Sequence, residues 1–223
     1  YSRLCGEYFD SQYAEEEFYW GEQPNLLVPL ISSHLEPDSR VLIIGCGEGR
    51  DALFLARLGF DVVATDIAAK GLEKARRLAE RTGCKLDLIN LDAHRSHDQL
   101  GIFDGLLSMN VIQLLNPDMI PERIEYFQSR VRSGGIIAIQ VFNVDDPNYV
   151  ECLKSGRQAR GSLTYEHPTR KYPIRFFDRG ELASYFEGWE FIHYHEGLLW
   201  DKPHGIQSGF HQHGFAQIIA RKN

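Results

Sequence analysis

Short apolar runs alternate with amphipathic stretches along the first two thirds of the chain. Residues 41–44 form a continuous run of valine, leucine and isoleucine, which is typical of a strand buried on both faces of a sheet. Residues 50–58 and 70–81 repeat apolar positions at helical spacing, and Gly59 and Gly83 follow them as C-terminal stop signals. The same patterns predict further strands over 61–64, 85–90, 105–109 and 136–142, and a helix over 121–131.

Strands that alternate with helices predict an α/β fold, a Rossmann-like doubly wound sheet that is mostly parallel. The last two strands, 189–195 and 214–220, have no helix-length segment between them. We therefore expect them to form an antiparallel pair at the C-terminal edge of the sheet. A short helix over 180–186 precedes this pair. In such sheets the ligand lies at the carboxyl ends of the strands.

Two segments depart from this rhythm. Residues 1–38 predict a helical lead-in, and residues 143–179 are broken by prolines and glycines, with one short helix near 149–154. We interpret 143–179 as an insertion or lid within a single domain that spans 1–223.

Composition and charge narrow the classes of function. The chain has 223 residues, 43% of them hydrophobic, which fits one soluble globular domain. Its net charge is −7, which disfavours a protein that mainly grips nucleic-acid phosphates. No apolar run approaches the ~20 residues of a membrane-spanning helix. The four cysteines form no C-x-x-C pair, so we expect free thiols in a reducing cytoplasm. The expected partner is a small-molecule substrate, with no nucleic acid and no membrane, for a monomer or homodimer.

The strongest local signal is a glycine-rich loop, Gly45-Cys46-Gly47-Glu48-Gly49, directly after the first strand and before a helix. Glycines there let the backbone approach a ligand closely, and the helix N-terminus adds free N–H groups. A dinucleotide fingerprint, G-x-G-x-x-G, requires glycine at position 50, where Arg50 stands. The observed spacing, G-x-G-x-G, is the pattern of enzymes that bind S-adenosylmethionine (SAM).

Polar residues follow the next strands at the same edge of the predicted sheet. Asp66 ends the second strand, where a carboxylate can accept hydrogen bonds from both ribose hydroxyls. The alternative is that Asp66 caps the helix over 70–81. Asp92 and Ala93 end the third strand, where they would meet an adenine edge, and the residues around Asn110 end the fourth.

With these motifs the chain resembles the class I SAM-dependent methyltransferases over nearly its whole length. Within them it is most similar to the tellurite-resistance (TehB-like) and thiopurine methyltransferase-like branch. The stretches that carry this closer likeness are residues 42–58, 181–196 and 215–222, together with Phe18-Tyr19-Trp20-Gly21, which is similar to a segment that closes over the cofactor.

The resemblance implies the seven-stranded class I methyltransferase fold, SAM as the cofactor and S-adenosylhomocysteine (SAH) as the product. Together with the loop and the strand ends, it implies these cofactor-binding residues: Trp20, Gly45, Cys46, Gly47, Gly49, Arg50, Asp66, Ile67, Asp92, Ala93, Asn110 and Val111. One position departs from the family pattern. Most of the class has an acid two residues before the first glycine, where this chain has Ile43. Another acid or a backbone carbonyl must then orient the methionine amino group, or binding is weaker.

Candidates for the acceptor side are less specific. Five of the nine histidines fall between positions 193 and 213. Four of them form two H-x-H pairs, 193/195 and 211/213, whose members share a strand face, and His204 stands between the pairs. They could be surface histidines, a substrate-side base or clamp, or metal ligands. We expect no metal site, because no acid or cysteine has ligand spacing to them. His204 is the first choice for a general base, and His211 and Arg175 are the other catalytic candidates.

The insertion also stands apart in charge. Residues 154–179 carry seven basic and two acidic side chains, a net charge of +5, so the remainder of the chain carries −12. This stretch is either a solvated loop or a lid whose arginines clamp an anionic acceptor.

The leading hypothesis is a SAM-dependent methyltransferase that acts by in-line methyl transfer on a small acceptor. That acceptor would be a thiol, a chalcogen or metalloid oxyanion such as tellurite, or another small metabolite. The alternatives are an RNA or protein methyltransferase and a non-catalytic SAM-binding domain.

Overall fold

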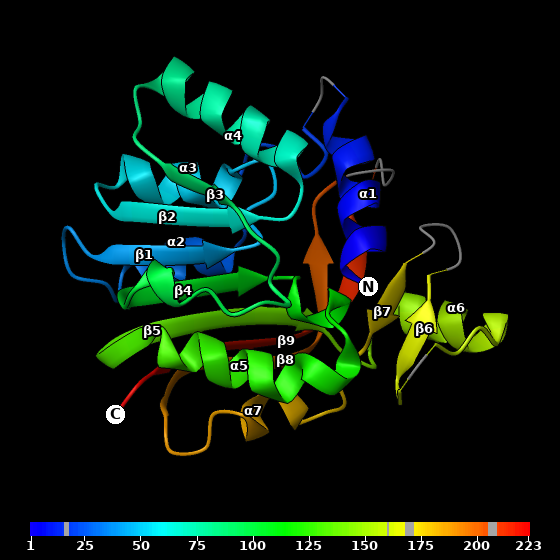
Figure 1. The fold of residues 1–223 in the computed structure, drawn as a ribbon. Helices are drawn as coiled ribbons and strands as arrows, with labels where there is room; N and C mark the ends of the chain where they lie inside the picture. Colours follow the sequence, from blue (N-terminus) through cyan, green and yellow to red (C-terminus); the bar gives the residue numbers. More distant parts are fainter. Residues whose placement is uncertain (16–17, 160, 168–171, 205–208) are drawn as a thin grey trace.

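A twisted seven-stranded sheet forms the centre of the molecule, in a computed structural model that describes residues 1–15, 18–159, 161–167, 172–204 and 209–223 (Figure 1). The strands run in the order β3-β2-β1-β4-β5-β9-β8. The first five along the chain are parallel to one another, whereas β9 is antiparallel to both of its neighbours. Their bounds are β1 Arg40–Ile44, β2 Asp61–Asp66, β3 Asp87–Asn90, β4 Phe103–Met109, β5 Val131–Phe142, β8 Glu190–Asp201 and β9 His211–Arg221. The α/β class and the antiparallel C-terminal edge are confirmed.

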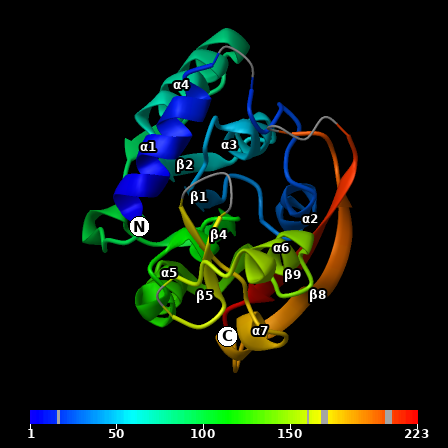
Figure 2. The same cartoon turned by 90° about the vertical axis from the view of Figure 1, so that its right-hand side faces the viewer.

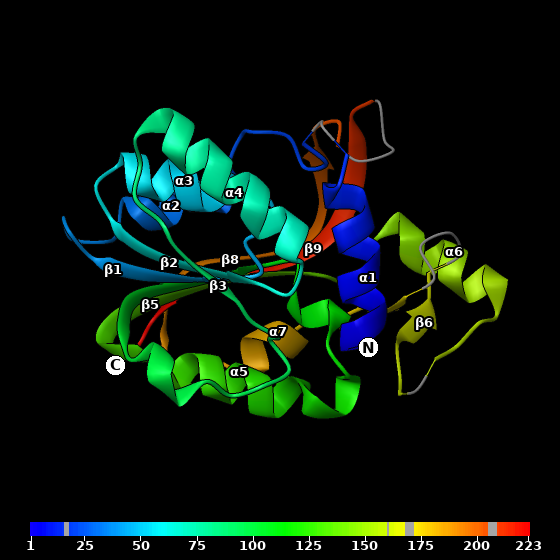
Figure 3. The same cartoon turned by 45° about the horizontal axis from the view of Figure 1, so that its top comes forward.

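Helices cover both faces of this sheet. They are α1 Ser2–Tyr13, α2 Leu27–Ser32, α3 Arg50–Arg57, α4 Ala69–Thr82, α5 Ile120–Ser129, α6 Pro147–Ser155 and α7 Glu181–Ser184, with short 3-10 turns at Asp98–Leu100, Ile112–Leu114 and Pro117–Met119. Figure 3 shows α2, α3 and α4 on one face and α5 and α7 on the other. Alternate residues of β1 therefore enter different cores: Val41 and Ile43 pack under α2 and α3, and Leu42 and Ile44 pack toward α5.

The lead-in is helical, as predicted. Helix α1 lies across the carboxyl ends of the parallel strands (Figures 1 and 3). Helix α1 also supplies a hydrogen-bond acceptor to the first turn of α4. The Asp10 carboxylate accepts a hydrogen bond from the Lys70 N–H at 2.9 Å. Among the described residues, no helix combines the length and the apolar character needed to cross a bilayer.

The last two strands are longer than the sequence pattern predicts. Their pairing continues past Leu198 opposite Gly214 to Asp201 opposite His211. In Figures 2 and 3 the distal part of this hairpin curves toward the face that α2, α3 and α4 cover. The expected ends at 195 and 214 were wrong, because cross-strand pairing, which alternation along one strand does not show, extends the hairpin.

The insertion contains more regular structure than expected. Helix α6 includes the predicted helix near 149–154, and β6 Thr164–Glu166 pairs with β7 Pro173–Arg175 in a separate antiparallel hairpin. Strands of three residues show no periodicity from which to predict them. Positions 160 and 168–171 lie outside the described residues, so Arg160, Arg170 and Lys171 of the basic stretch do too.

Candidate functional site

The glycine-rich loop connects β1 to α3 as predicted. Gly45 has a φ of +74°, and a Cβ there would lie 2.2 Å from the Val111 side chain. Any other residue would therefore meet both backbone strain and a clash at this position. The loop thus brings the end of β1 against the segment that follows β4.

Asp66 joins this loop to the end of β2. Its carboxylate accepts hydrogen bonds from the Gly47 N–H at 2.7 Å and the Ala68 N–H at 2.8 Å. Burial raises the pKa of Asp66 to about 6, against the lowering effect of these backbone donors. The N-cap of α4 is Ala68, so the helix-capping interpretation of Asp66 is wrong. Spare lone pairs on the carboxylate remain for ribose hydroxyls.

A cavity lies at the carboxyl ends of β1, β2 and β4. It is lined by Trp20, Gly45, Cys46, Gly47, Arg50, Asp66, Ile67, Asp92, Ala93, Asn110 and Val111, which are the residues expected to bind the cofactor with one exception. The exception is Gly49, which does not line the cavity. A Cβ on Gly49 would lie 2.6 Å from the Ala75 Cβ, so this glycine serves the packing of α3 against α4.

Helix α1 supplies a wall of the cavity that the sequence interpretation missed. Cys5, Phe9 and Tyr13 line it, together with Tyr172 from the insertion. Tyr13 accepts a hydrogen bond from the Trp20 indole at 2.8 Å. The four-residue spacing of positions 5, 9 and 13 was the available signal.

The segment around Trp20 is held over the loop by a buried acid. The Glu48 carboxylate accepts hydrogen bonds from the Tyr19 and Trp20 N–H groups at 3.2 and 3.3 Å, and pairs with Lys74 at 2.8 Å. Arg50 donates to the Trp20 carbonyl at 2.7 Å. These hydrogen bonds and the ion pair therefore link the glycine-rich loop, α4 and the N-terminal lead-in at the cavity.

Ile43 packs in the core and is 2% exposed, so it offers the cavity nothing polar. Asp51, in the first turn of α3, does line the cavity, and its carboxylate accepts a hydrogen bond from the Asn25 N–H at 2.7 Å. Sequence reasoning missed it because it lies after the loop, whereas the family acid precedes it.

Asp92, which follows β3, lines the cavity as well. Burial works to raise its pKa, but hydrogen bonds from the backbone and ring of His94 outweigh this and hold the pKa below its ordinary value. His94 is fixed in turn, since its Nε2 accepts from the Asn116 N–H at 3.1 Å. His94 also lines the cavity.

A second cavity adjoins the first, because Trp20, Arg50, Asn110 and Phe142 line both. His204 and His213 line the second cavity. Gln140 donates to the Asn110 side-chain oxygen at 3.2 Å and so orients it at the junction.

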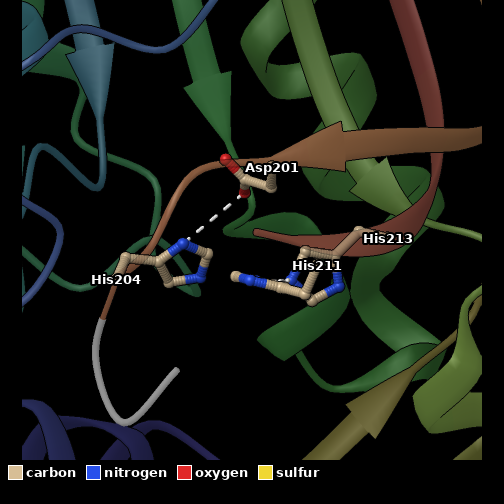
Figure 4. Close-up of side chains that lie close together, drawn as sticks. All are labelled: Asp201, His204, His211 and His213. Carbon is tan, nitrogen blue, oxygen red and sulfur yellow. Dashed lines mark hydrogen bonds and ion pairs between the residues drawn. The ribbon is translucent and has the colours of Figure 1, made fainter. Parts of the chain in front are cut away.

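Three histidines of the β8–β9 hairpin, His204, His211 and His213, lie close together (Figure 4). The ring centroids of His204 and His211 are 4.7 Å apart, and His211 and His213 are 4.8 Å apart. Burial lowers the pKa of His204 to about 4, although Asp201 opposes this. His204 and His211, two of the residues predicted for the acceptor side, therefore lie next to each other.

Arg175 is not brought to either cavity. Its guanidinium pairs with both carboxylate oxygens of Glu181, at 3.1 and 2.7 Å, and lies 4.8 Å from the Phe177 ring centroid. Residues alternate across a strand, so the neighbour Ile174 lines the first cavity instead. The structure thus gives Arg175 a partner in α7 and not a place at the site.

Comparison with known proteins agrees with a cofactor site of this kind. Residues 41–135 match the methyltransferase domain family. The probable S-adenosyl-L-methionine-dependent methyltransferase TehB of Haemophilus influenzae (strain 10810) is 24% identical over 192 residues, which are 83% of this chain and 59% of that protein. The chain therefore spans less than two thirds of the length of this curated relative.

Two solved structures share the fold. The crystal structure of TehB from Haemophilus influenzae matches 98% of this chain and 67% of that chain, with a TM-score of 0.71 and 22% identity. The crystal structure of Burkholderia thailandensis 1,6-didemethyltoxoflavin-N1-methyltransferase, with 1,6-didemethyltoxoflavin and SAH bound, matches 100% of this chain and 89% of that chain, with a TM-score of 0.73 and 20% identity. The matched methyltransferase domain, the similarity to TehB and the shared fold agree with the resemblance to class I SAM-dependent methyltransferases of the TehB-like branch, and they support SAM as the cofactor.

Proposed function

We propose that the chain transfers the methyl group of SAM to a small thiol, a chalcogen or metalloid oxyanion such as tellurite, or another small metabolite. The observation that carries this proposal is the junction of the two cavities at Trp20, Arg50, Asn110 and Phe142. In-line displacement needs the nucleophile directly behind the methyl group, and two adjoining cavities provide such neighbouring places.

The cofactor fits the first cavity as follows. Asp66 binds the ribose hydroxyls, Asp92 and Ala93 meet the adenine, and the glycine-rich loop receives the methionine part. We assign the methionine ammonium group to Asp51, which supplies the carboxylate that Ile43 lacks.

On the acceptor side, His204 lines the second cavity and contacts the acceptor, and His211 lies beside it with 4.7 Å between the ring centroids. The positive stretch of the insertion is less suited to clamp it, since Arg175 and Arg179 pair with Glu181 and Asp145. The similarity to TehB, and with it to the tellurite-resistance branch, supports tellurite among the candidates. The free cysteines Cys5, Cys46, Cys84 and Cys152 agree with a cytoplasmic protein.

Two other functions remain as outcomes of the tests. An RNA or protein methyltransferase would need a large recognition surface, and the net charge of −7 opposes RNA. A non-catalytic SAM-binding domain would explain the missing acid at Ile43. We propose that the protein acts on a small-molecule substrate as a monomer or homodimer, without binding nucleic acid or a membrane.

Isothermal titration calorimetry with SAH, followed by transfer of labelled methyl groups to tellurite, selenite and small thiols, tests the proposal. We expect SAH binding and methylated product from one acceptor class. Absence of SAH binding would refute the proposal, and binding without turnover on any acceptor would favour the non-catalytic alternative.

The role of Asp51 is tested by Asp51→Asn. Loss of a charged hydrogen-bond partner costs about 1.5–3 kcal/mol, so SAH should bind roughly 10- to 100-fold more weakly. 5′-Methylthioadenosine lacks the amino-acid group and is the control ligand, whose affinity should not change. Equal losses for both ligands would show that the substitution disturbs the whole cavity.

A further inference from the structure

Four potential metal ligands gather at the tip of the β8–β9 hairpin. Asp201 ends β8, His204 follows it, and His211 and His213 begin β9. Each offers one ligand atom, and these atoms all lie within 4.8 Å of one another. Figure 4 shows the His204 ring on one side of the group and the His211 and His213 rings on the other. The sequence could not indicate this acid, because cross-strand pairing of Asp201 with His211 brings it in.

Two of the rings are oriented by oxygens that only accept hydrogen bonds. The His213 Nδ1 lies 2.8 Å from the Asp146 carboxylate, which is fully buried, and the His211 Nδ1 lies 3.0 Å from the Gly209 carbonyl. Each Nδ1 therefore carries the proton, and each Nε2 is left with a lone pair. Carboxylate and carbonyl partners of this kind orient metal-binding histidines in general.

The third ring follows the same arrangement. The His204 Nδ1 lies 3.0 Å from the Lys202 carbonyl and 3.6 Å from the Asp201 carboxylate. Its other nitrogen is turned toward His211 (Figure 4). Three Nε2 lone pairs thus face one space.

The closest pair needs a cation. The Nε2 atoms of His211 and His213 are 3.1 Å apart. With both protons on Nδ1, two lone pairs face each other at that distance, which is repulsive unless a positive charge lies between them. A proton on one ring or a metal ion bound by both would supply it.

We propose that His204, His211 and His213 bind a zinc ion through Nε2, with Asp201 orienting His204 and balancing charge. Imidazole suits zinc, and three histidines with an open fourth position are the arrangement of catalytic zinc sites. Zinc–nitrogen bonds of about 2.0–2.1 Å set tetrahedral ligands about 3.4 Å apart. The Nε2 atoms of His211 and His213, 3.1 Å apart, are near that spacing. A rotation of the His204 side chain would bring its Nε2 to the same distance from them.

The site adjoins the place where the methyl group would be transferred. The rings of His204 and His213 lie 5.1 and 4.9 Å from those of Trp20 and Phe142, which line both cavities. If the proposed function holds, the open position selects thiols. A thiol binds there as a thiolate and releases its proton to solvent. Its sulfur lone pair then forms the new carbon–sulfur bond, while the methyl–sulfonium bond breaks and leaves its electron pair on SAH.

Titration with zinc chloride, with metal content measured by mass spectrometry, tests the site directly. We expect one zinc ion per chain and at least 100-fold weaker binding in His211→Gln, a half-buried position that should tolerate the change. Asp201→Asn should weaken binding about 10- to 100-fold through loss of the orienting carboxylate. The control is His34→Ala, which removes an exposed histidine two residues after α2 and should bind zinc as the wild type does.

Two results would overturn the proposal: no stoichiometric zinc in the wild type, or equal zinc affinity in His211→Gln and His34→Ala. The first, with SAH binding intact, would mean that a shared proton holds the two rings together. SAH affinity is measured on the same samples without added zinc. Loss of SAH binding with zinc binding intact would refute the proposed function and leave the metal site standing.

Discussion

At the scale of single residues, the buried carboxylate of Asp66 links the loop, the start of α4 and the expected ribose position. It accepts hydrogen bonds from Gly47 and Ala68. Asp10 of α1, which faces it, adds to the upward shift of its pKa. Tyr13 and Cys46 lie close as well, but burial raises their own pKa values well above the ordinary range, so both are neutral near pH 7. Asp66 is therefore a group of the cavity whose charge changes near pH 6.

SAH binding should weaken as the pH falls through about 6, because protonation of Asp66 removes the acceptor for ribose hydroxyls. With a pKa of about 6, we expect the SAH dissociation constant to be about tenfold higher at pH 5 than at pH 7. Calorimetry over this range measures it. In Asp66→Asn the affinity should be lower at pH 7 and independent of pH. A wild-type affinity that is flat between pH 5 and 7 would contradict this role.

At the scale of elements, α3 and α4 approach each other closely at the end of the glycine-rich loop. Gly49 begins α3 with a φ of +87°, and a Cβ there would lie 2.6 Å from the Ala75 Cβ in α4. The third glycine thus permits helix packing, and the first permits the approach of Val111. One sequence motif therefore serves two different contacts.

Gly49→Ala should destabilise the protein by about 2–4 kcal/mol, from the left-handed backbone and from overpacking against Ala75. Gly59→Ala is the matched control, because Gly59 has a φ of +92° and nothing within 4 Å of the added Cβ. It carries the backbone cost alone, about 1 kcal/mol. Urea unfolding of both variants measures the difference. Equal costs would show that α4 moves away without loss.

At the scale of the whole molecule, α1, the loop and the strand ends enclose the first cavity from segments far apart in the chain. A ligand held by all of them stabilises the folded state as a unit, because the unfolded chain has no such cavity.

SAH at 100 times its dissociation constant should add about 2.7 kcal/mol to the free energy of unfolding. For a chain of this size that raises Tm by about 5–10 °C. Differential scanning calorimetry measures the shift, and NAD at the same concentration should produce none, because Arg50 stands where a dinucleotide loop needs glycine. A shift with NAD and not with SAH would contradict the cofactor assignment.

The sequence by itself determined the alternating strands and helices, the antiparallel edge, and the part of the first cavity's lining that comes from the glycine-rich loop and the strand ends. These features depend on short-range signals: apolar periodicity, glycines at a strand-to-helix turn, and polar residues at strand ends. Because parallel strands end at one edge of the sheet, these local signals also predict which side chains meet.

Only the tertiary structure decided the rest. The wall from α1, the position of Asp51 beneath Asn25 and the pairing of Arg175 with Glu181 depend on how distant segments pack. The group at the hairpin tip depends on strand register, which sets Asp201 opposite His211. Register and packing are set by the sum of contacts across the sheet, and no single segment of the sequence contains that sum.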